Sequence, residues 1–147
     1  MNDKPFLPCI NELVRCYQAF EAYSSAHIRT LDLTAPQFDI IATLGNTPGM
    51  TPKELGEQTL ITKGTLTGII DRLEAKDLVQ RTAHSRDGRS QIVQLTEAGN
   101  ALFEKIFPEH MAHLHKAFAG FGRQDFENIE TALARLRAAF VSAASPG

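Results

Sequence analysis

The residues best suited to chemistry lie between positions 62 and 76, where the sequence has helical periodicity. Two glycines within it, Gly64 and Gly68, fall opposite a predicted buried stripe of four apolar residues, Leu66, Ile69, Ile70 and Leu73. A glycine inside a helix costs roughly 1 kcal/mol relative to alanine, so two of them favour close approach to a partner surface. The hydroxyl and cationic groups around this strip are suited to bind phosphates and base edges: Thr62, Lys63, Thr65, Thr67 and Arg72.

A charged β-hairpin is predicted to follow this helix. Two short stretches with β-branched residues, 78–83 and 90–95, enclose a polar segment that contains glycine and two basic candidates, Arg86 and Arg89. In a winged helix-turn-helix the second helix enters the major groove and a hairpin reaches the flanking backbone or minor groove. The alternative, a solvated helix face with indifferent glycines, is weakened by the hairpin.

The elements that must position these residues are mostly helices. The sequence predicts one long helix over 7–30, a second that begins after Thr34 with Pro36 in its first turn, and a short third helix. Thr51 and Glu54 open the third helix as a capping box, with Thr51 accepting from the Glu54 amide and Glu54 from the Thr51 amide. The expected fold is mainly α with a small β-hairpin wing.

Heptad seams in the first and last helices predict a homodimer. Apolar residues step by three and four along both: Ile10, Leu13, Tyr17 and Phe20, then Phe126, Ile129, Leu133, Leu136 and Phe140. We therefore expect one chain, 1–147, in which 33–96 form the DNA-binding lobe and 1–32 and 97–147 the dimerisation helices.

Composition sets outer limits on function. The net charge of −2 argues weakly against nucleic acid, but residues 62–92 hold six basic and four acidic side chains, against nine and thirteen elsewhere. No apolar run approaches the ~20 residues of a membrane helix, and no signal peptide pattern opens the chain, so we expect a cytoplasmic protein without a membrane partner. Cys9 and Cys16 are expected to be reduced thiols.

Short motifs in a fixed order resemble the MarR-type multiple-antibiotic-resistance regulators. The residues that carry the resemblance span about seventy positions: Leu33-Thr34-Ala35-Pro36-Gln37-Phe38, Leu55-Gly56, Gly64-Thr65-Leu66-Thr67, Ile70-Asp71-Arg72-Leu73-Glu74, Leu78-Val79-Gln80-Arg81, Asp87-Gly88-Arg89 and Leu95-Thr96-Glu97-Ala98-Gly99. The resemblance implies a dimer on a palindromic double-stranded operator, usually as a repressor. It also implies that Arg89 enters the minor groove, that Asp87 shapes the hairpin tip, and that Asp71 pairs with Arg81 as a brace. Asp77 departs from the family pattern, which has glycine at the end of the recognition helix.

Such regulators often bind small phenolic or anionic aromatic effectors between the dimer region and the DNA lobe. On this resemblance, Phe20, Tyr23 and His27 are candidates to line an effector pocket, although they could equally pack a core.

Other hypotheses have less support in the residues. Redox sensing through Cys9 is disfavoured, because Ala35 stands where the peroxide-sensing branch has tyrosine. His110, His113 and His115 could suggest zinc, but a hydrated polar face of a long helix is the preferred interpretation. No catalytic set, metal site or cofactor motif is found, so we expect no enzyme. A winged-helix protein-interaction module without DNA binding remains the alternative.

Overall fold

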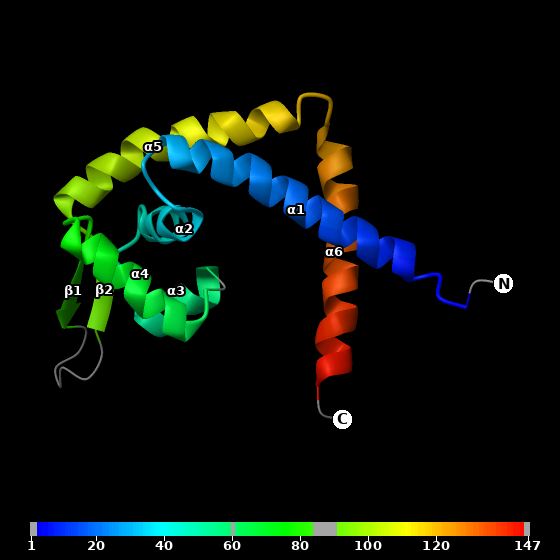
Figure 1. Ribbon diagram of the computed structural model, residues 1–147, viewed down its shortest axis with the longest axis horizontal. Helices are drawn as coiled ribbons and strands as arrows, with labels where there is room; N and C mark the ends of the chain where they lie inside the picture. The colour runs from blue at the N-terminus through cyan, green and yellow to red at the C-terminus, as the bar shows by residue number, and fades with distance from the viewer. Residues whose placement is uncertain (1–2, 60, 84–90, 146–147) are drawn as a thin grey trace. The chain divides into compact units, whose positions relative to one another are not determined.

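The computed structural model describes residues 3–59, 61–83 and 91–145. The chain divides into two compact units, 1–113 and 114–147. The elements in chain order are α1 (Leu7–Thr30), α2 (Ala35–Leu44), α3 (Pro52–Thr59), α4 (Lys63–Ala75), β1 (Val79–Ala83), β2 (Gln91–Leu95), α5 (Glu97–Ala117) and α6 (Arg123–Ala144). The predicted fold class, helices with one small hairpin, is confirmed (Figure 1).

Local capping explains where the short helices begin. The Thr34 hydroxyl accepts from the Gln37 amide at 3.3 Å, and the Gln37 side chain accepts from the Thr34 amide at 3.0 Å, which completes a capping box for α2. At α3 the Thr51 hydroxyl accepts from the Glu54 amide at 3.1 Å, as predicted. The Glu54 carboxylate, however, accepts from the Thr51 hydroxyl at 3.0 Å in place of the predicted amide, because a hydroxyl both donates and accepts.

One aspartate ends α4 in a left-handed conformation. Asp77 has a φ of 60°, and the Leu78 amide donates back to the Leu73 carbonyl at 3.0 Å. Aspartate tolerates this conformation better than most residues, since its short polar side chain can bond locally. The left-handed turn is therefore formed although aspartate stands where the family pattern has glycine.

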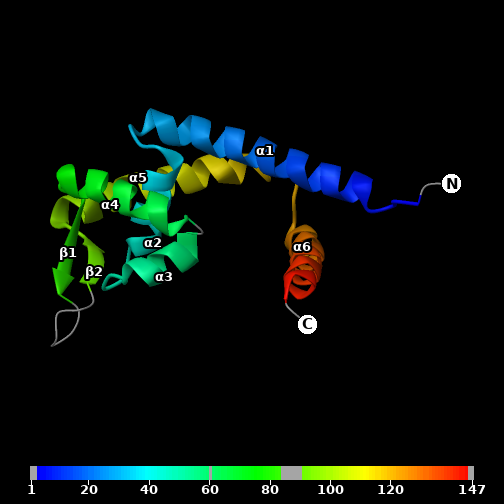
Figure 2. The same cartoon turned by 60° about the horizontal axis from the view of Figure 1, so that its bottom comes forward.

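The core of residues 1–113 lies beneath α4. The predicted stripe is buried, with Leu73 fully inaccessible and Ile70 2% exposed. In Figure 1, α2 lies between the long helices α1 and α5 and the α3–α4 pair, and in the turned view of Figure 2 α3 is again on the side of α2 away from α1 and α5. The partners of the stripe come from every neighbouring element: Ile28, Phe38, Ile40, Ile41, Leu44, Leu55, Val79, Val93, Phe103 and Ile106.

The hairpin is antiparallel and is paired beyond its own two strands. Val79 lies opposite Leu95 and Arg81 opposite Val93. Met50, before α3, exchanges two backbone hydrogen bonds with Val93, at 2.9 and 2.7 Å. The helix-turn-helix and the hairpin are thus joined through the backbone. The predicted tip residues Arg86, Asp87 and Arg89 lie outside the described residues.

The start of α5 is bonded tightly to the end of α4. The Thr96 hydroxyl donates to the Asp77 carbonyl at 2.6 Å and accepts from the Gly99 amide at 3.0 Å. The Thr96 amide donates to the Leu78 carbonyl at 3.1 Å. A Cβ atom added at Gly99 would overlap that carbonyl oxygen, so only glycine fits without movement of the backbone.

Residues 114–147 hold α6, a helix with no buried residue. Its predicted seam is largely uncovered in the single chain, with Leu133 and Phe140 both 50% exposed. At its start, Phe118, Phe121 and Phe126 pack their rings together with centroids 5.2 to 5.7 Å apart. None of the described helices, α6 included, is apolar enough over sufficient length to cross a bilayer.

We expect Gly99→Ala to destabilise the fold by about 1–3 kcal/mol, the usual cost of forcing a methyl group into occupied space. Gly68→Ala is the matched control, because an added Cβ there meets no atom within 4 Å. That control should gain up to about 1 kcal/mol from helix propensity. Urea unfolding at fixed protein concentration measures both, and equal stabilities would contradict the close contact at Gly99.

Candidate nucleic-acid interface

The outward face of α4 gathers the predicted contact residues on one surface. Seven of the nine candidates lie on α4 or cap it, and all seven are exposed: Thr62, Lys63, Gly64, Thr65, Thr67, Gly68 and Arg72. The other two, Arg86 and Arg89, lie outside the described residues. The buried stripe lies on the opposite side of the helix, so these seven residues are accessible to a partner.

The two glycines of α4 are not required by packing against any of the residues that the structure describes. A Cβ atom added at Gly64 or Gly68 would meet nothing within 4 Å, whereas one at Gly45 would overlap the Phe103 ring. Gly68, inside the helix, therefore lowers helix stability by roughly 1 kcal/mol, and no contact with a described residue explains its presence. The bare strip is suited to close approach by an external surface.

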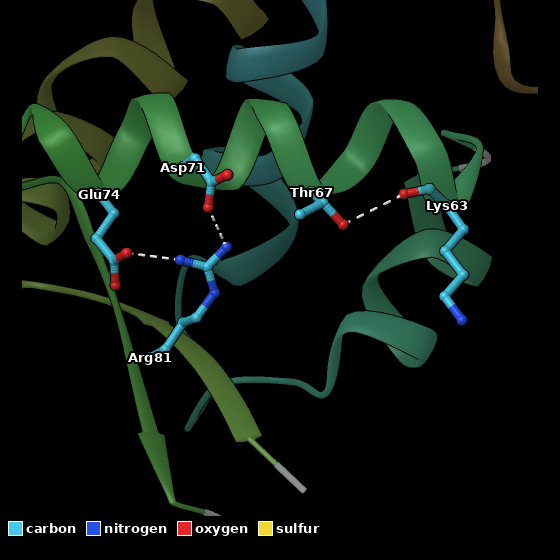
Figure 3. A network of polar contacts seen from close by, with 5 residues as sticks. All are labelled: Lys63, Thr67, Asp71, Glu74 and Arg81. Atoms are coloured by element: carbon cyan, nitrogen blue, oxygen red, sulfur yellow. Dashed lines mark hydrogen bonds and ion pairs between the residues drawn. The ribbon is translucent and has the colours of Figure 1, made fainter.

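Hydroxyl groups beside the strip are partly engaged by the helix itself. The Thr62 hydroxyl donates to the Thr65 hydroxyl at 3.1 Å, and the Thr67 hydroxyl donates to the Lys63 carbonyl at 3.4 Å. These bonds orient the side chains, and each hydroxyl oxygen still offers acceptor capacity. Lys63 and Thr67 share one side of α4 (Figure 3).

Arg81 of β1 forms a forked ion pair with two carboxylates of α4. One terminal nitrogen lies 2.6 Å from Asp71 Oδ1 and the other lies 2.6 Å from Glu74 Oε1 (Figure 3). The guanidinium is only 20% exposed, against 60% for the Asp71 side chain and 43% for Glu74. The planar guanidinium fork suits two acceptors at once, and here it joins β1 to α4.

Sequence reasoning expected the Asp71–Arg81 pair but missed Glu74. The spacing held the clue, because Glu74 follows Asp71 by three residues and so lies on the same side of the helix. The third expected member, Asp87, lies outside the described residues. With both carboxylates bound to Arg81, much of their negative charge beside the contact face is compensated.

A surface hollow of about 500 Å³ lies next to that face, between α3 and α4. Two lysines, Lys53 and Lys63, contribute to its lining, and Leu66 and Ile61 contribute apolar surface. The remaining lining residues are Pro52, Gly56, Glu57 and Thr67. Lys53 was not among the predicted contacts, although its position in the first turn of α3 places a cation next to the recognition helix.

The three candidates for an effector pocket behave differently from one another. Phe20 is 54% exposed on α1. Tyr23 and His27 instead pack on α5: the Tyr23 hydroxyl donates to the His113 carbonyl at 2.6 Å, and the His27 ring stacks on the His113 ring at 4.4 Å. The hollow between α3 and α4 is lined by other residues, so a pocket at these three positions stays a prediction.

The interpretation of the α5 histidines as a hydrated face is wrong for two of them. His110 is 2% exposed and His113 is half-buried, because both rings pack against α1; only His115 of the three is exposed. Within the described part of the chain, no group of three or more histidine, cysteine, aspartate or glutamate side chains is placed to hold a metal ion. Cys9 and Cys16 are both free and exposed on α1.

Comparison with known proteins gives consistent matches. The MarR family model matches residues 31–90. The regulator MhqR of Bacillus subtilis, an HTH-type transcriptional regulator, is 27% identical over 124 residues, which cover 84% of this chain and 86% of that protein. The structure of BpsR of Bordetella bronchiseptica, whose DNA binding is regulated by 6-hydroxynicotinic acid, matches with a TM-score of 0.76 and 27% identity over 88% of this chain and 98% of that one. NadR in complex with 4-hydroxyphenylacetate matches with a TM-score of 0.71 and 28% identity over 85% and 89%.

The Arg81 fork should contribute modestly to stability. In double-mutant cycles that combine Arg81→Gln with Asp71→Asn or Glu74→Gln, we expect coupling energies of about 0.2–1 kcal/mol, because both acids are well exposed. The coupling should shrink as salt is raised from about 0.05 to 0.5 M. Chemical denaturation of the four proteins in each cycle measures it, and zero coupling at low salt would argue against the ion pairs.

Proposed function

The chain belongs to the MarR family of winged helix-turn-helix, DNA-binding transcriptional regulators, and we propose that it binds a pseudo-palindromic operator as a homodimer. We further propose that it acts as a repressor, since a dimer seated across a promoter excludes other proteins from the same DNA. The proposal assigns the contact to α4 in the major groove and to Arg86 and Arg89 near the backbone or minor groove.

One observation carries this proposal, the bare strip on α4. Gly64 and Gly68 leave open space along the exposed face of α4, from its first turn to its middle, and Lys63, Thr65 and Arg72 flank it. Cations and hydroxyls bind phosphate oxygens and base edges, and a strip without side chains lets the helix axis come close to the groove floor. Lys53 at the adjacent hollow is a further phosphate contact in this proposal.

The proposal of a dimer is based on the exposure of α6. An isolated 22-residue helix with no buried side chain has little tertiary support in a single chain. A contiguous exposed apolar seam of this kind marks an interaction site. In a closed two-fold assembly, the seam of one chain is covered by the same seam of a second copy. The resulting dimer would present two α4 helices, one to each half of an inverted repeat.

An effector of the phenolic or anionic aromatic class is part of the proposal. Two proteins of similar structure are associated with such compounds: 6-hydroxynicotinic acid regulates the DNA binding of BpsR, and NadR forms a complex with 4-hydroxyphenylacetate. Both compounds combine an aromatic ring with an acid group. Phe20, Tyr23 and His27 remain the candidate residues, and a mixed aromatic and imidazole lining would suit such a ligand.

Binding rather than catalysis is proposed as the mode of action. Ser24 Oγ lies 3.1 Å from His110 Nε2, a pairing that activates serine nucleophiles elsewhere. Ser24, however, is 8% exposed within α1, so a substrate could not reach its hydroxyl in this conformation. A redox role for the exposed Cys9 is not part of the proposal, because no second feature of the described residues supports it.

Operator binding is the test of this function. Genomic fragments retained by the purified protein should share an inverted repeat with half-sites about one helical turn, 10–10.5 base pairs, apart. If the dimer neutralises about 6–8 phosphates, the log–log slope of affinity against salt should lie near −5 to −7. Gly68→Ala should weaken binding by about 1–3 kcal/mol although it stabilises the helix, because the methyl group occupies space needed by DNA.

Other results would count against it. A footprint on one asymmetric half-site, or a slope shallower than about −2, would favour a protein-interaction module over an operator-binding dimer. Unchanged affinity in Gly68→Ala would remove the bare strip from the contact, and the same protein's raised unfolding midpoint would show that the variant was folded.

Dimerisation should depend on the α6 seam. We expect Leu133→Asp to weaken self-association about 100-fold or more, because an unpaired carboxylate would be buried among apolar side chains. Thr131→Asp is the matched control, since helical geometry places position 131 on the side opposite the seam. Sedimentation equilibrium measures both variants, and a folded wild-type monomer at micromolar concentration would contradict the proposed dimer.

A further inference from the structure

Three histidines, His27 of α1 and His110 and His113 of α5, form a cluster where the two long helices cross. The His27 ring stacks on His113 at 4.4 Å and on His110 at 5.1 Å. Tyr23 extends the stack, with its ring 4.1 Å from that of His113. Within residues 1–113, this histidine cluster is the polar centre of the contact between α1 and α5.

The hydrogen bond between two of these rings limits how many protons the cluster can hold. His27 Nδ1 lies 2.8 Å from His110 Nδ1, so one nitrogen must donate and the other must accept. A neutral pair satisfies this, and so does a pair with a single imidazolium. Two imidazolium rings cannot, because both Nδ1 atoms would then be donors pointing at each other. Full protonation must therefore break the bond.

The surroundings of His110 oppose even the first added proton. The ring is 2% exposed, and burial lowers the pKa of His110, with further lowering from the positive charges that His27 and His113 would carry. From α1 it also faces the Ser24 hydroxyl at 3.1 Å, and from α2 it faces the uncharged Phe38 ring, with centroids 4.6 Å apart. The closed cluster thus favours the neutral form of His110, whereas a histidine released to water has its ordinary pKa near 6.5.

The sign of the pH effect follows from this difference. Because the pKa of His110 is lowered in the closed state, the cluster contributes its full stability above pH about 6.5. That contribution is lost as the pH falls from about 6.5 through the lowered pKa, since the open state then binds more protons. Acid therefore drives opening.

The cluster is connected to the recognition helix through one buried side chain. Phe38, 5% exposed, packs its ring edge against His110 and belongs to α2, which lies between the long helices and the α3–α4 pair. A shift of α5 away from α1 removes the support of Phe38 and disturbs the base on which α4 rests.

We propose that the histidine cluster is an acid-responsive switch, in which protonation separates α1 from α5 and weakens the binding of DNA by α4. The predicted effect on DNA affinity rests on the proposed DNA-binding function. The switch itself, opening of the cluster, is a property of α1 and α5 and is measurable without DNA.

The chain provides its own optical reporter for that opening. It has no tryptophan and two tyrosines, Tyr17 and Tyr23. Tyr17 is 60% exposed, so Tyr17→Phe leaves Tyr23 as the only tyrosine with little disturbance. In the closed cluster the Tyr23 hydroxyl donates to the His113 carbonyl and its ring stacks on imidazole, and both contacts change on opening.

The experiment titrates Tyr23 emission of the full-length Tyr17→Phe protein between pH 8 and 5. We expect a transition below pH about 6.5 that is absent or shifted by about one unit or more in His110→Gln, which keeps polar atoms near Ser24 and His27 but cannot charge. His27→Gln is the second variant, chosen because that ring is less buried should His110→Gln fail to fold. His115→Gln, exposed on the same helix, is the control and should titrate as the parent does.

DNA affinity is then followed over the same pH range at constant salt. In the parent it should fall by up to about tenfold per pH unit for each proton taken up, and it should fall less in His110→Gln or His27→Gln. A flat Tyr23 titration, or one unchanged in both cluster variants, would overturn the switch. A normal titration with pH-independent DNA affinity would overturn its connection to α4. Absence of DNA binding at every pH would instead refute the proposed function, while the Tyr23 titration would still decide whether the cluster opens.

Discussion

One-sided burial of α4 is the constraint on which the rest of the structure depends. A helix that offers a bare, polar face to a partner must be held entirely by its opposite face, and Leu66, Ile69, Ile70 and Leu73 are all buried. At roughly 1.5–3 kcal/mol for each buried side chain of this size, the stripe outweighs the propensity cost of two glycines several times over. The arrangement of α2, α3, the hairpin and α5 follows from the need to cover these four residues.

The contacts of α4 with the hairpin complement that burial. The ion pairs of Arg81 orient α4 more than they stabilise the fold, since exposed ion pairs contribute little to the free energy of unfolding. Their geometric effect is larger: Asp71 and Glu74 lie on neighbouring turns of one helix, so a single planar group limits rotation of α4 about its axis. The face that reaches a partner is therefore set by a buried stripe on one side and a guanidinium on another.

The sequence predicts the parts of this fold that depend on local periodicity. The bounds of α1, the Thr34 cap, the α4 stripe and the pairing of the two strands all come from the spacing of a few neighbouring residues. The α5 histidines could not be placed in this way. On α5 alone, His110 is one polar residue among several, and only the approach of Tyr23, Ser24 and His27 from α1, more than eighty positions away, makes it a buried, hydrogen-bonded ring. Glu74 is an intermediate case. The helical spacing predicts that it lies on the same side of α4 as Asp71, but that spacing does not predict its ion pair with Arg81 of the hairpin.

The joint at Gly99 has a mechanical consequence. The Leu78 carbonyl leaves no room for a side chain at position 99, and Thr96 is hydrogen-bonded to both Asp77 and Gly99. The start of α5 is therefore fixed tightly to the end of α4, and α5 can turn only about this point. His110 lies eleven residues further along α5, a lever of about 16 Å at 1.5 Å per residue. A displacement of about 1 Å at that end turns the helix by roughly 4° about the pivot. Insertion of a single residue between Gly99 and His110 would rotate the two positions by about 100° relative to each other around the helix axis. The number of residues between them therefore determines how a movement at His110 is transmitted to Gly99.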